Sequence, residues 1–405
     1  MTIGIGGSTA AAELVKMTSM RGDAPPIGVD ERQHRIERAQ ALMQSSGIDA
    51  IWLDVSTSLT YFTGLRLGRS ERLHGALLPA RGEITYLSPA FEVEKLRTML
   101  TLGGDIAAWD EHEDPTTLVV ETLRAKGIAQ GRIGIDEATP FATFDGLRRA
   151  SNSYDYVNAS SITATCRSQK TAREIALMQT AKNITMEVHR ATARILHEGI
   201  TTTEVQAFIT AAHAKLGAEG PLPFNIVLFG QATAYPHGVP YPQTLVPGDM
   251  VLVDVGAPID GYLSDITRSY VFGEPTDRQR QIWDLEKAAQ LAAFSAAKLG
   301  APCEAIDRAA RGVIEKAGFG PGYATPGLPH RTGHGIGMDV HETPYIVQGD
   351  KTKLAAGMTF SIEPMICLYG EFGVRLEDHI QMTGEGPRWF TEPAHSIDDP
   401  FGYEA

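Results

Sequence analysis

Hydrophobic and polar residues follow regular periods along most of the chain, and the period switches between helical and extended spacing. Residues 31–46 place apolar side chains on one face of a predicted helix, and residues 48–53 follow as a predicted strand. Strand-like segments at 75–80 and 83–88 and helical segments at 90–100 and 115–127 come next. This alternation predicts an α/β unit in the first part of the chain.

The second part of the chain is predicted to be a sheet covered by helices. One long amphipathic helix begins near residue 166 and continues to Gly199. A second helix is opened by Thr276, with Gln279 three residues later, and is closed by Gly300. Apolar segments predict strands at 224–230, 249–256, 266–273, 358–368 and 373–383. We expect an arm over residues 1–27, a first domain over 28–165 and a second domain over 166–405.

Composition and charge narrow the class of protein. A chain of 405 residues with 43% hydrophobic residues suits two globular domains. The net charge of -13 argues against nucleic acid or an anionic membrane surface as the main partner. The chain lacks a basic, apolar leader and a run of about 20 apolar residues, so we expect no secretion and no membrane helix. Three scattered cysteines without a CxxC motif predict free, buried thiols in a reducing cytoplasm.

The first unusual feature is the segment VLVDVGAPIDGYLSDITRSY, residues 251–270, which places Asp254 inside an apolar strand. An unpaired carboxylate there is costly, so the strand hides either a salt bridge or a cation. Asp265 follows eleven residues later, and a turn at Gly261–Tyr262 would return a second strand beside the first. The two carboxylates are then expected to face one another.

Two further carboxylates and one histidine complete the candidate set. Glu363 and Glu377 each stand within an apolar strand-like segment, and glycines flank His334 closely enough for backbone or ligand to approach its ring. Four inward carboxylates without matching cations would repel one another, whereas two divalent metal ions would neutralise them. One imidazole among them suits manganese, zinc or cobalt better than magnesium or calcium.

These motifs resemble those of the creatinase, prolidase and aminopeptidase P group, whose "pita-bread" catalytic domain is shared with methionine aminopeptidase. The resemblance covers most of residues 166–390, through VLVDVGAPIDGYLSDITRSY, TGHGIGMDVHE, FSIEPMI and GVRLEDHI. Residues 35–65 also resemble the smaller first domain of this group. The resemblance implies an α/β (α+β) fold, with a smaller N-terminal creatinase-like domain followed by a pita-bread metallopeptidase domain.

The resemblance also implies a dinuclear metal site. Its ligands would be Asp254, Asp265, His334, Glu363 and Glu377, with Asp265 and Glu377 bridging two divalent ions. We expect manganese, with zinc and cobalt as alternatives. The ions would activate water and polarise the scissile carbonyl, and Glu363 would also shuttle a proton to the leaving nitrogen.

The resemblance assigns two further histidines to catalysis. His341 matches the histidine that steadies the tetrahedral intermediate, and His237 matches the one near the scissile bond.

The activity implied by overall resemblance is hydrolysis of Xaa-Pro dipeptides, as in prolidases. The alternative is an Xaa-Pro aminopeptidase, or aminopeptidase P, that acts on longer peptides. A lyase of small sulfonium compounds is a remoter alternative. A creatinase-like enzyme and a metal-free binding module are disfavoured because all five ligand residues are present.

Substrate recognition is less well marked in the sequence. A dipeptidase must bind the C-terminal carboxylate of its substrate. Eukaryotic-type prolidases place an arginine between the histidine and first glutamate motifs, where this chain has only Lys351 and Lys353. The remaining candidates are His330, Arg331 and Arg375, although Arg375 is expected to orient Glu377 instead.

Recognition of a proline ring would need an apolar pocket near the metal ions. Phe224, Tyr235 and Tyr369 could line a pocket for the proline ring, although aromatic residues of this kind are more often part of a core. By resemblance we expect a homodimer.

Overall fold

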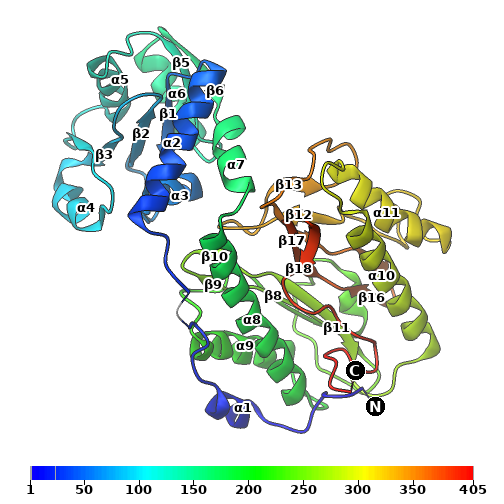
Figure 1. Ribbon diagram of the computed structural model, residues 1–405. Helices are drawn as coiled ribbons and strands as arrows, with labels where there is room; N and C mark the ends of the chain where they lie inside the picture. The colour runs from blue at the N-terminus through cyan, green and yellow to red at the C-terminus, as the bar shows by residue number, and fades with distance from the viewer. Residues whose placement is uncertain (1, 23, 405) are drawn as a thin grey trace. The chain divides into compact units, whose positions relative to one another are not determined.

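The computed structural model describes residues 2–22 and 24–404. The chain forms two compact units, one spanning Ile27–Arg167 and the other combining the residues before Ile27 with those from Ser168 onward. Helices and strands occur in both units, as the predicted α/β class requires (Figure 1). In the described part of the chain, none of the helices has the length and apolar content needed to cross a bilayer.

The smaller unit is built on one mixed sheet with the strand order β4-β3-β2-β1-β5-β6. The strands are β1 (Ala50–Asp54), β2 (Gly75–Pro79), β3 (Thr85–Pro89), β4 (Asp105–Trp109), β5 (Gly131–Ile135) and β6 (Tyr154–Asn158). The helices are α2 (Val29–Ser46), α3 (Thr57–Thr63), η1 (Ala90–Glu92), α4 (Val93–Met99), α5 (Pro115–Ala125), α6 (Phe141–Ala150) and α7 (Ser160–Ser168).

The sequence explains the start of this smaller unit. Helix α2 ends where Gly47 adopts a left-handed conformation with φ of 65° and its N–H bonds the carbonyl of Met43. The chain then enters β1, whose residues are all buried, and Trp52 joins the apolar core beneath the sheet. The predicted helix, turn and strand are confirmed here.

The larger unit contains the remaining elements. Its helices are α1 (Ala10–Lys16), α8 (Ala172–Ile195), α9 (Thr202–Leu216), η2 (Gly230–Ala234), α10 (Asp277–Ala296) and α11 (Cys303–Lys316). Its first strands are β7 (Asn225–Phe229), β8 (Met250–Val255), β9 (Pro258–Ile259), β10 (Tyr262–Leu263) and β11 (Ile266–Val271). The later strands are β12 (Gly333–Gly335), β13 (Glu342–Ile346), β14 (Thr359–Ile362), β15 (Met365–Leu368), β16 (Phe372–Arg375), β17 (Asp378–Thr383) and β18 (Gly386–Trp389).

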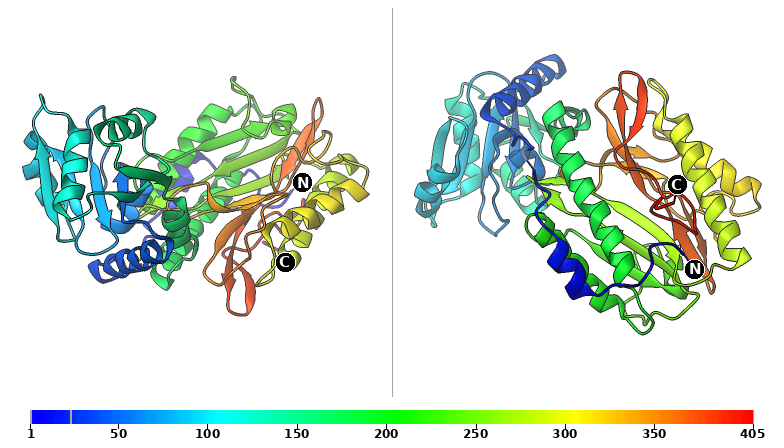
Figure 2. Two further views of the ribbon diagram at one scale, coloured as in Figure 1. Left: turned by 90° about the horizontal axis from the view of Figure 1, so that it is seen from above. Right: turned by 60° about the horizontal axis from the view of Figure 1, so that its bottom comes forward.

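Two sheets of the larger unit lie between two pairs of helices. One sheet has the order β11-β8-β7 and the other β13-β12-β14-β17-β18. Helices α8 and α9 (green) lie on one side of these strands, and α10 and α11 (yellow) lie on the other (Figures 1 and 2). A bridge between Thr267 and Glu377 connects the two sheets. Residues from both sheets therefore meet in the middle of the unit.

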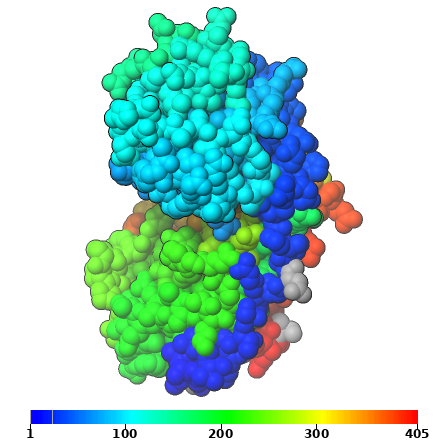
Figure 3. Space-filling model, turned by 90° about the vertical axis from the view of Figure 1, so that its left-hand side faces the viewer, coloured from blue at the N-terminus to red at the C-terminus, as the bar shows by residue number. Residues whose placement is uncertain are grey.

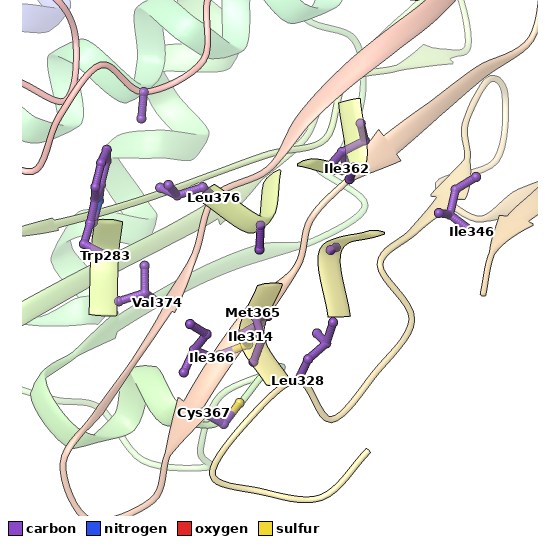
Figure 4. Packing of buried hydrophobic residues seen from close by; sticks show 14 of the residues in the cluster. Trp283, Ile314, Leu328, Ile346, Ile362, Met365, Ile366, Cys367, Val374 and Leu376 are labelled. Atoms are coloured by element: carbon purple, nitrogen blue, oxygen red, sulfur yellow. The ribbon is translucent and has the colours of Figure 1, made fainter. Parts of the chain in front are cut away.

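An apolar core fills the space between the strands and α10 with α11. Trp283 and Ile314 come from the helices, Ile362 and Met365 come from the strands, and Leu376 lies between β16 and β17 (Figure 4). Each of these side chains is almost completely removed from solvent, which favours a rigid support for the strands. The cysteines at 166, 303 and 367 are free and buried, as the sequence predicts.

Several predicted boundaries are wrong. Helix α10 is opened by the Thr276–Gln279 capping box, but it ends at Ala296 and Gly300 lies outside it. The long helix expected from near residue 166 is α8, which begins at Ala172 and ends at Ile195, and a separate helix, α7, ends at Ser168. The segments 358–368 and 373–383 each form two strands rather than one. The first break contains Pro364, which has no N–H to donate to a sheet.

The N-terminal arm packs on the larger unit. Its helix α1 and the following residues lie over the surface of α8 and α9, at the foot of the view in Figure 3. Glu13 fixes the arm, because its carboxylate accepts hydrogen bonds from Arg194 at 2.8 Å, Lys16 at 2.9 Å and Ser8 at 2.6 Å. Burial raises the pKa of Glu13, but these donors dominate and lower it to about 2.

The arm contact predicts a pH-dependent contribution to stability. Replacing Glu13 with Gln should cost about 1–3 kcal/mol at neutral pH, because Arg194 and Lys16 lose a charged partner. Because the folded pKa is depressed from 4.5 to about 2, this contribution is complete above pH 4.5 and is lost as pH falls toward 2. Urea unfolding at pH 7 and at low pH measures it, with the exposed Glu385→Gln as a control. Equal stability of Glu13→Gln and the wild type at neutral pH would contradict it.

Candidate metal centre

The five residues predicted as ligands come from both sheets of the larger unit. Asp254 lies in β8, opposite Thr267 of β11, and Asp265 directly precedes β11. The connection contains the short hairpin of β9 and β10, so the turn lies at Asp260–Gly261, where both residues have positive φ. The expected turn at Gly261–Tyr262 is therefore displaced by one residue.

The other three residues lie at a strand centre and at two strand breaks. His334 is the middle residue of β12. Glu363 stands between β14 and β15, and Glu377 stands between β16 and β17. The glutamates were expected inside continuous strands, but each occupies a bend at which the sheet pairing changes. A bend frees the side chain from the strict alternation of a strand.

The predicted metal ligands, catalytic histidines and carboxylate-binding candidates all line one cavity of about 780 Å³ in the larger unit. They are Asp254, Asp265, His334, Glu363, Glu377, His237, His341, His330, Arg331 and Arg375. Phe224, Ile226, Val340 and Val347 give the same cavity an apolar wall. Tyr235 and Tyr369, the other aromatic candidates, pack against each other with ring centroids 5.2 Å apart and do not line it.

The tightest group consists of Asp265, His334 and Glu377, which each place a ligand atom within 4.8 Å of the others. The Nδ1 atom of His334 lies 3.1 Å from the carbonyl oxygen of Gly335 and is positioned to donate to it. Its Nε2 atom then faces the carboxylates, at 3.0 Å from Glu363 Oε1 and 3.6 Å from Asp265 Oδ2. This is the orientation that a metal-binding imidazole requires.

Arg375 occupies a different place from the one predicted. Its Nη2 donates to Asp254 Oδ2 at 2.5 Å, and its Nε donates to Thr267 Oγ1 at 3.1 Å. Thr267 in turn donates to Glu377 Oε2 at 2.7 Å, so Arg375 reaches Glu377 only through this hydroxyl. Its Nη1 donates to the carbonyl of Pro236 at 3.0 Å. Because every guanidinium nitrogen has a protein partner, Arg375 is poorly placed to bind a substrate carboxylate.

Burial and mutual repulsion perturb these acids. Burial raises the pKa of Asp265 well above its ordinary value, and the neighbouring Glu377 and Asp254 raise it further. Burial, Glu363 and Asp254 likewise raise the pKa of Glu377 well above its ordinary range. Burial also raises the pKa of Asp254, although Arg375 opposes this. Burial would raise the pKa of Glu363 too, but the adjacent His334 lowers it to about 2.

The donor set fits divalent metal ions. Asp254 Oδ1 and Glu377 Oε1 are buried and have no hydrogen-bond partner among the described residues. Buried carboxylate oxygens are normally paired, so these two atoms are oriented as ligands would be. Carboxylates and one imidazole supply the oxygen and nitrogen donors that manganese, zinc and cobalt accept.

Buried polar side chains that the sequence analysis missed support the ligand-bearing segments. Lys182, Thr185 and His189 lie on one face of α8, and contact Leu263 O at 3.1 Å, Ser264 Oγ at 2.7 Å and Ile266 O at 3.0 Å. These contacts flank Asp265 on both sides. The spacing of 182, 185 and 189 was the available signal, because it places polar residues on a helical face that is otherwise buried.

A second support lies beside Glu377. Arg268 is completely buried, and it donates to the carbonyl of Glu377 at 2.9 Å and to Asp378 Oδ1 at 2.7 Å. The sequence offered no signal for this pair, because Arg268 and Asp378 are distant in the chain.

The remaining histidines lie around the ligand group. The ring of His341 lies 4.2 Å from that of His334, centroid to centroid. Partial burial and His334 lower the pKa of His341 to about 4. His330 has Nδ1 positioned to donate to Arg331 O at 2.7 Å, and burial lowers its pKa. His237 follows η2 and also lines the cavity. Both His330 and His341 are thus neutral at pH 7.

The chain matches two known protein families. Residues 176–384 match metallopeptidase family M24, and residues 35–169 match the creatinase/prolidase N-terminal domain. The predicted resemblance and fold class are confirmed by these matches.

Individual relatives cover most of the chain. The Xaa-Pro dipeptidase of Lactobacillus helveticus is 32% identical over 359 residues, which are 88% of this chain and 96% of that protein. The solved structure of a dipeptidase from Mycobacterium ulcerans is similar with a TM-score of 0.86 at 32% identity, covering 92% and 99% of the two chains. A prolidase from Thermococcus sibiricus is similar with a TM-score of 0.82 at 31% identity, covering 89% and 96%.

The donor set predicts that metal binding stabilises the fold. Manganese added to chelator-treated protein should raise the unfolding temperature, because a ligand at 100 times its Kd contributes about 2.7 kcal/mol. His334→Ala should lose most of this gain, whereas His197→Ala, which changes an exposed histidine, should keep it. Thermal melts with and without metal make the comparison. An undiminished gain in His334→Ala would show that the ions bind elsewhere.

Proposed function

The chain belongs to metallopeptidase family M24, and from this premise we propose that it hydrolyses the Xaa-Pro bond of dipeptides with the help of divalent metal ions. One observation supports the proposal above the others. The acidic and imidazole donors, five additional histidine or arginine side chains and several apolar side chains line the same cavity. A peptide with a proline ring needs such a combination, because one end of it is apolar and the reacting bond is polar.

The metal ions would be held by Asp254, Asp265, His334, Glu363 and Glu377. We propose two ions per chain, with manganese as the native metal. Zinc and cobalt are the alternatives, because both accept the same donors. When bound, such ions lower the pKa of water and polarise a carbonyl oxygen.

Side chains of the cavity would transfer a proton and orient the substrate. Glu363 is ionised at neutral pH, because its pKa lies at about 2. We assign to this carboxylate the transfer of a proton from the attacking water to the proline nitrogen. Ser361 Oγ donates to Glu363 Oε1 at 3.1 Å and holds that oxygen in place. We assign His341 to stabilising the tetrahedral intermediate and His237 to contacting the substrate near the scissile bond.

Arg331 is the side chain best placed to bind the substrate carboxylate. Its guanidinium lies over the ring of Tyr345, 4.6 Å from the centroid, and has no hydrogen bond or ion pair with the described residues. His330 Nε2 is also buried without a partner in this part of the structure. Phe224 and Ile226 would pack against the apolar part of the substrate. An arginine in the cavity without an ion-pair partner among the described residues favours substrates that carry their free carboxylate next to the proline ring.

Three broader properties remain part of the proposal. We propose a cytoplasmic location, which suits three free cysteines, and a homodimer. We also propose that residues 28–165 form a creatinase-like domain and that residues 166–405 form the catalytic domain, preceded by an arm over residues 1–27. The compact units, divided at Ile27 and Arg167, support this division.

Hydrolysis of Ala-Pro and Ala-Pro-Ala tests the proposed activity. Manganese-loaded protein should cleave Ala-Pro with a kcat/KM at least tenfold higher than that for Ala-Pro-Ala. Glu363→Gln should lower kcat by about 10²–10⁴, because the proton acceptor is lost. Preference for the tripeptide would identify an aminopeptidase. Cleavage of neither peptide with manganese, zinc or cobalt would overturn the peptidase assignment.

The role of Arg331 is tested with a substrate that lacks the carboxylate. Arg331→Met should raise KM for Ala-Pro by about 10–100-fold, because a charged hydrogen bond is worth about 1.5–3 kcal/mol. KM for Ala-Pro amide should change little. Arg388→Met removes an exposed arginine and serves as the control. An equal increase in KM for Ala-Pro and for Ala-Pro amide would show that Arg331 does not bind the carboxylate.

A further inference from the structure

One wall of the cavity is a loop without regular structure of its own. Residues 318–332 connect α11 to β12 and contain neither a helix nor a strand, although Gly327 forms an isolated bridge with Cys367. The loop supplies Tyr323, Pro329, His330 and Arg331 to the cavity. It therefore contains the groups that the proposed function assigns to the substrate carboxylate.

One buried arginine binds three carbonyl groups of the loop. Arg311 of α11 donates through Nη1 to the carbonyls of Gly322 at 2.6 Å and Leu328 at 2.8 Å. Its Nη2 donates to the carbonyl of His330 at 2.8 Å. The guanidinium also lies 4.3 Å from the centroid of the Tyr323 ring. Four positions of the loop are thus fixed against one side chain that is only 6% exposed.

Asp307, one helical turn before Arg311, also holds the loop in place. Its carboxylate accepts from Arg311 Nη2 at 3.1 Å and Nε at 3.3 Å, and it accepts from the hydroxyl of Thr332 at 2.7 Å. Asp307 is 1% exposed, so its charge is compensated by Arg311 rather than by water. The pair therefore holds the loop at both ends of the cavity-lining stretch.

Apolar contacts bury part of the loop in the core, but they do not orient its carbonyl groups. Leu328 is buried in the core near Ile314 and Cys367 (Figure 4). The carbonyl of Leu328 and that of His330 nevertheless depend on the guanidinium for their hydrogen bonds. A planar guanidinium can hold several carbonyls in one geometry, and a lysine ammonium cannot reproduce that arrangement.

We propose that Arg311, together with Asp307, is a positioning residue that sets the carboxylate-binding wall of the cavity and so determines preference for substrates with a free C-terminus. This inference rests on the proposed function, because it concerns the wall that contains Arg331. Neither residue lines the cavity, so both act through the loop. A displacement of about 1 Å at such a wall is enough to cost about 10²-fold in efficiency.

The test compares Arg311→Met with Arg308→Met, which changes an exposed arginine on the same helix. In manganese-loaded protein, Arg311→Met should raise KM for Ala-Pro at least tenfold while kcat changes less than threefold. KM for Ala-Pro amide should stay within threefold of the wild type. Arg311→Lys, which keeps the charge, should show a smaller increase and provides the measurement if Arg311→Met does not fold. Arg308→Met should match the wild type with both substrates.

A second measurement tests whether Arg311 holds the loop in place, independently of the activity. Hydrogen exchange of residues 318–332 should become at least tenfold faster in Arg311→Met and remain unchanged in Arg308→Met, whether or not the protein cleaves Ala-Pro. Unchanged exchange would overturn the anchoring role. Faster exchange with equal increases in KM for acid and amide would overturn the role in carboxylate preference. If the wild type cleaves neither substrate, the proposed function fails and the exchange result still decides the anchor.

Discussion

Four carboxylates buried around one cavity impose the constraint on which the rest of the larger unit depends. Their mutual repulsion and burial raise the pKa values of Asp254, Asp265 and Glu377. A fold can tolerate such a cluster only if other groups offset the charge and hold the side chains apart. Arg375 offsets one acid directly, and His334 Nε2 lies 3.0 Å from Glu363 Oε1. Divalent ions at the unpaired oxygens of Asp254 and Glu377 would complete the compensation.

The architecture places this cluster where two sheets meet, and each sheet is rigid because helices cover it from outside. The polar face of α8 holds the segment around Asp265, and Arg268 holds the peptide of Glu377. These supports act on the backbone next to the acids rather than on the acids themselves. The carboxylate oxygens consequently keep their capacity for ligands, while the chain that presents them has little freedom to relax.

The sequence was informative where a function depends on residue type in a fixed order. Asp254, Asp265, His334, Glu363 and Glu377 could be singled out because acids in apolar segments are unusual, and the structure brings them to one cavity. Strand breaks at the two glutamates could not be predicted from alternation alone, which continues through them. The partner of Arg375 was also mistaken, because whether it contacts Asp254 or Glu377 is decided by the pairing of β8 with β11 and by the bend after β16. Contacts such as Arg268–Asp378 join distant parts of the chain and leave no local pattern.

The proposed metal ligands and the residues proposed to bind the substrate carboxylate are held by different means in this molecule. The donors lie on or beside strands whose hydrogen bonds are made within the sheets. Arg331 and His330 lie on a loop whose carbonyls are satisfied by side chains of α11. A change in the loop can therefore alter which end of a peptide is recognised without disturbing the acids, because the two sets share few supporting bonds. This separation gives a physical reason why one metal-binding framework can serve dipeptides in one protein and longer peptides in another.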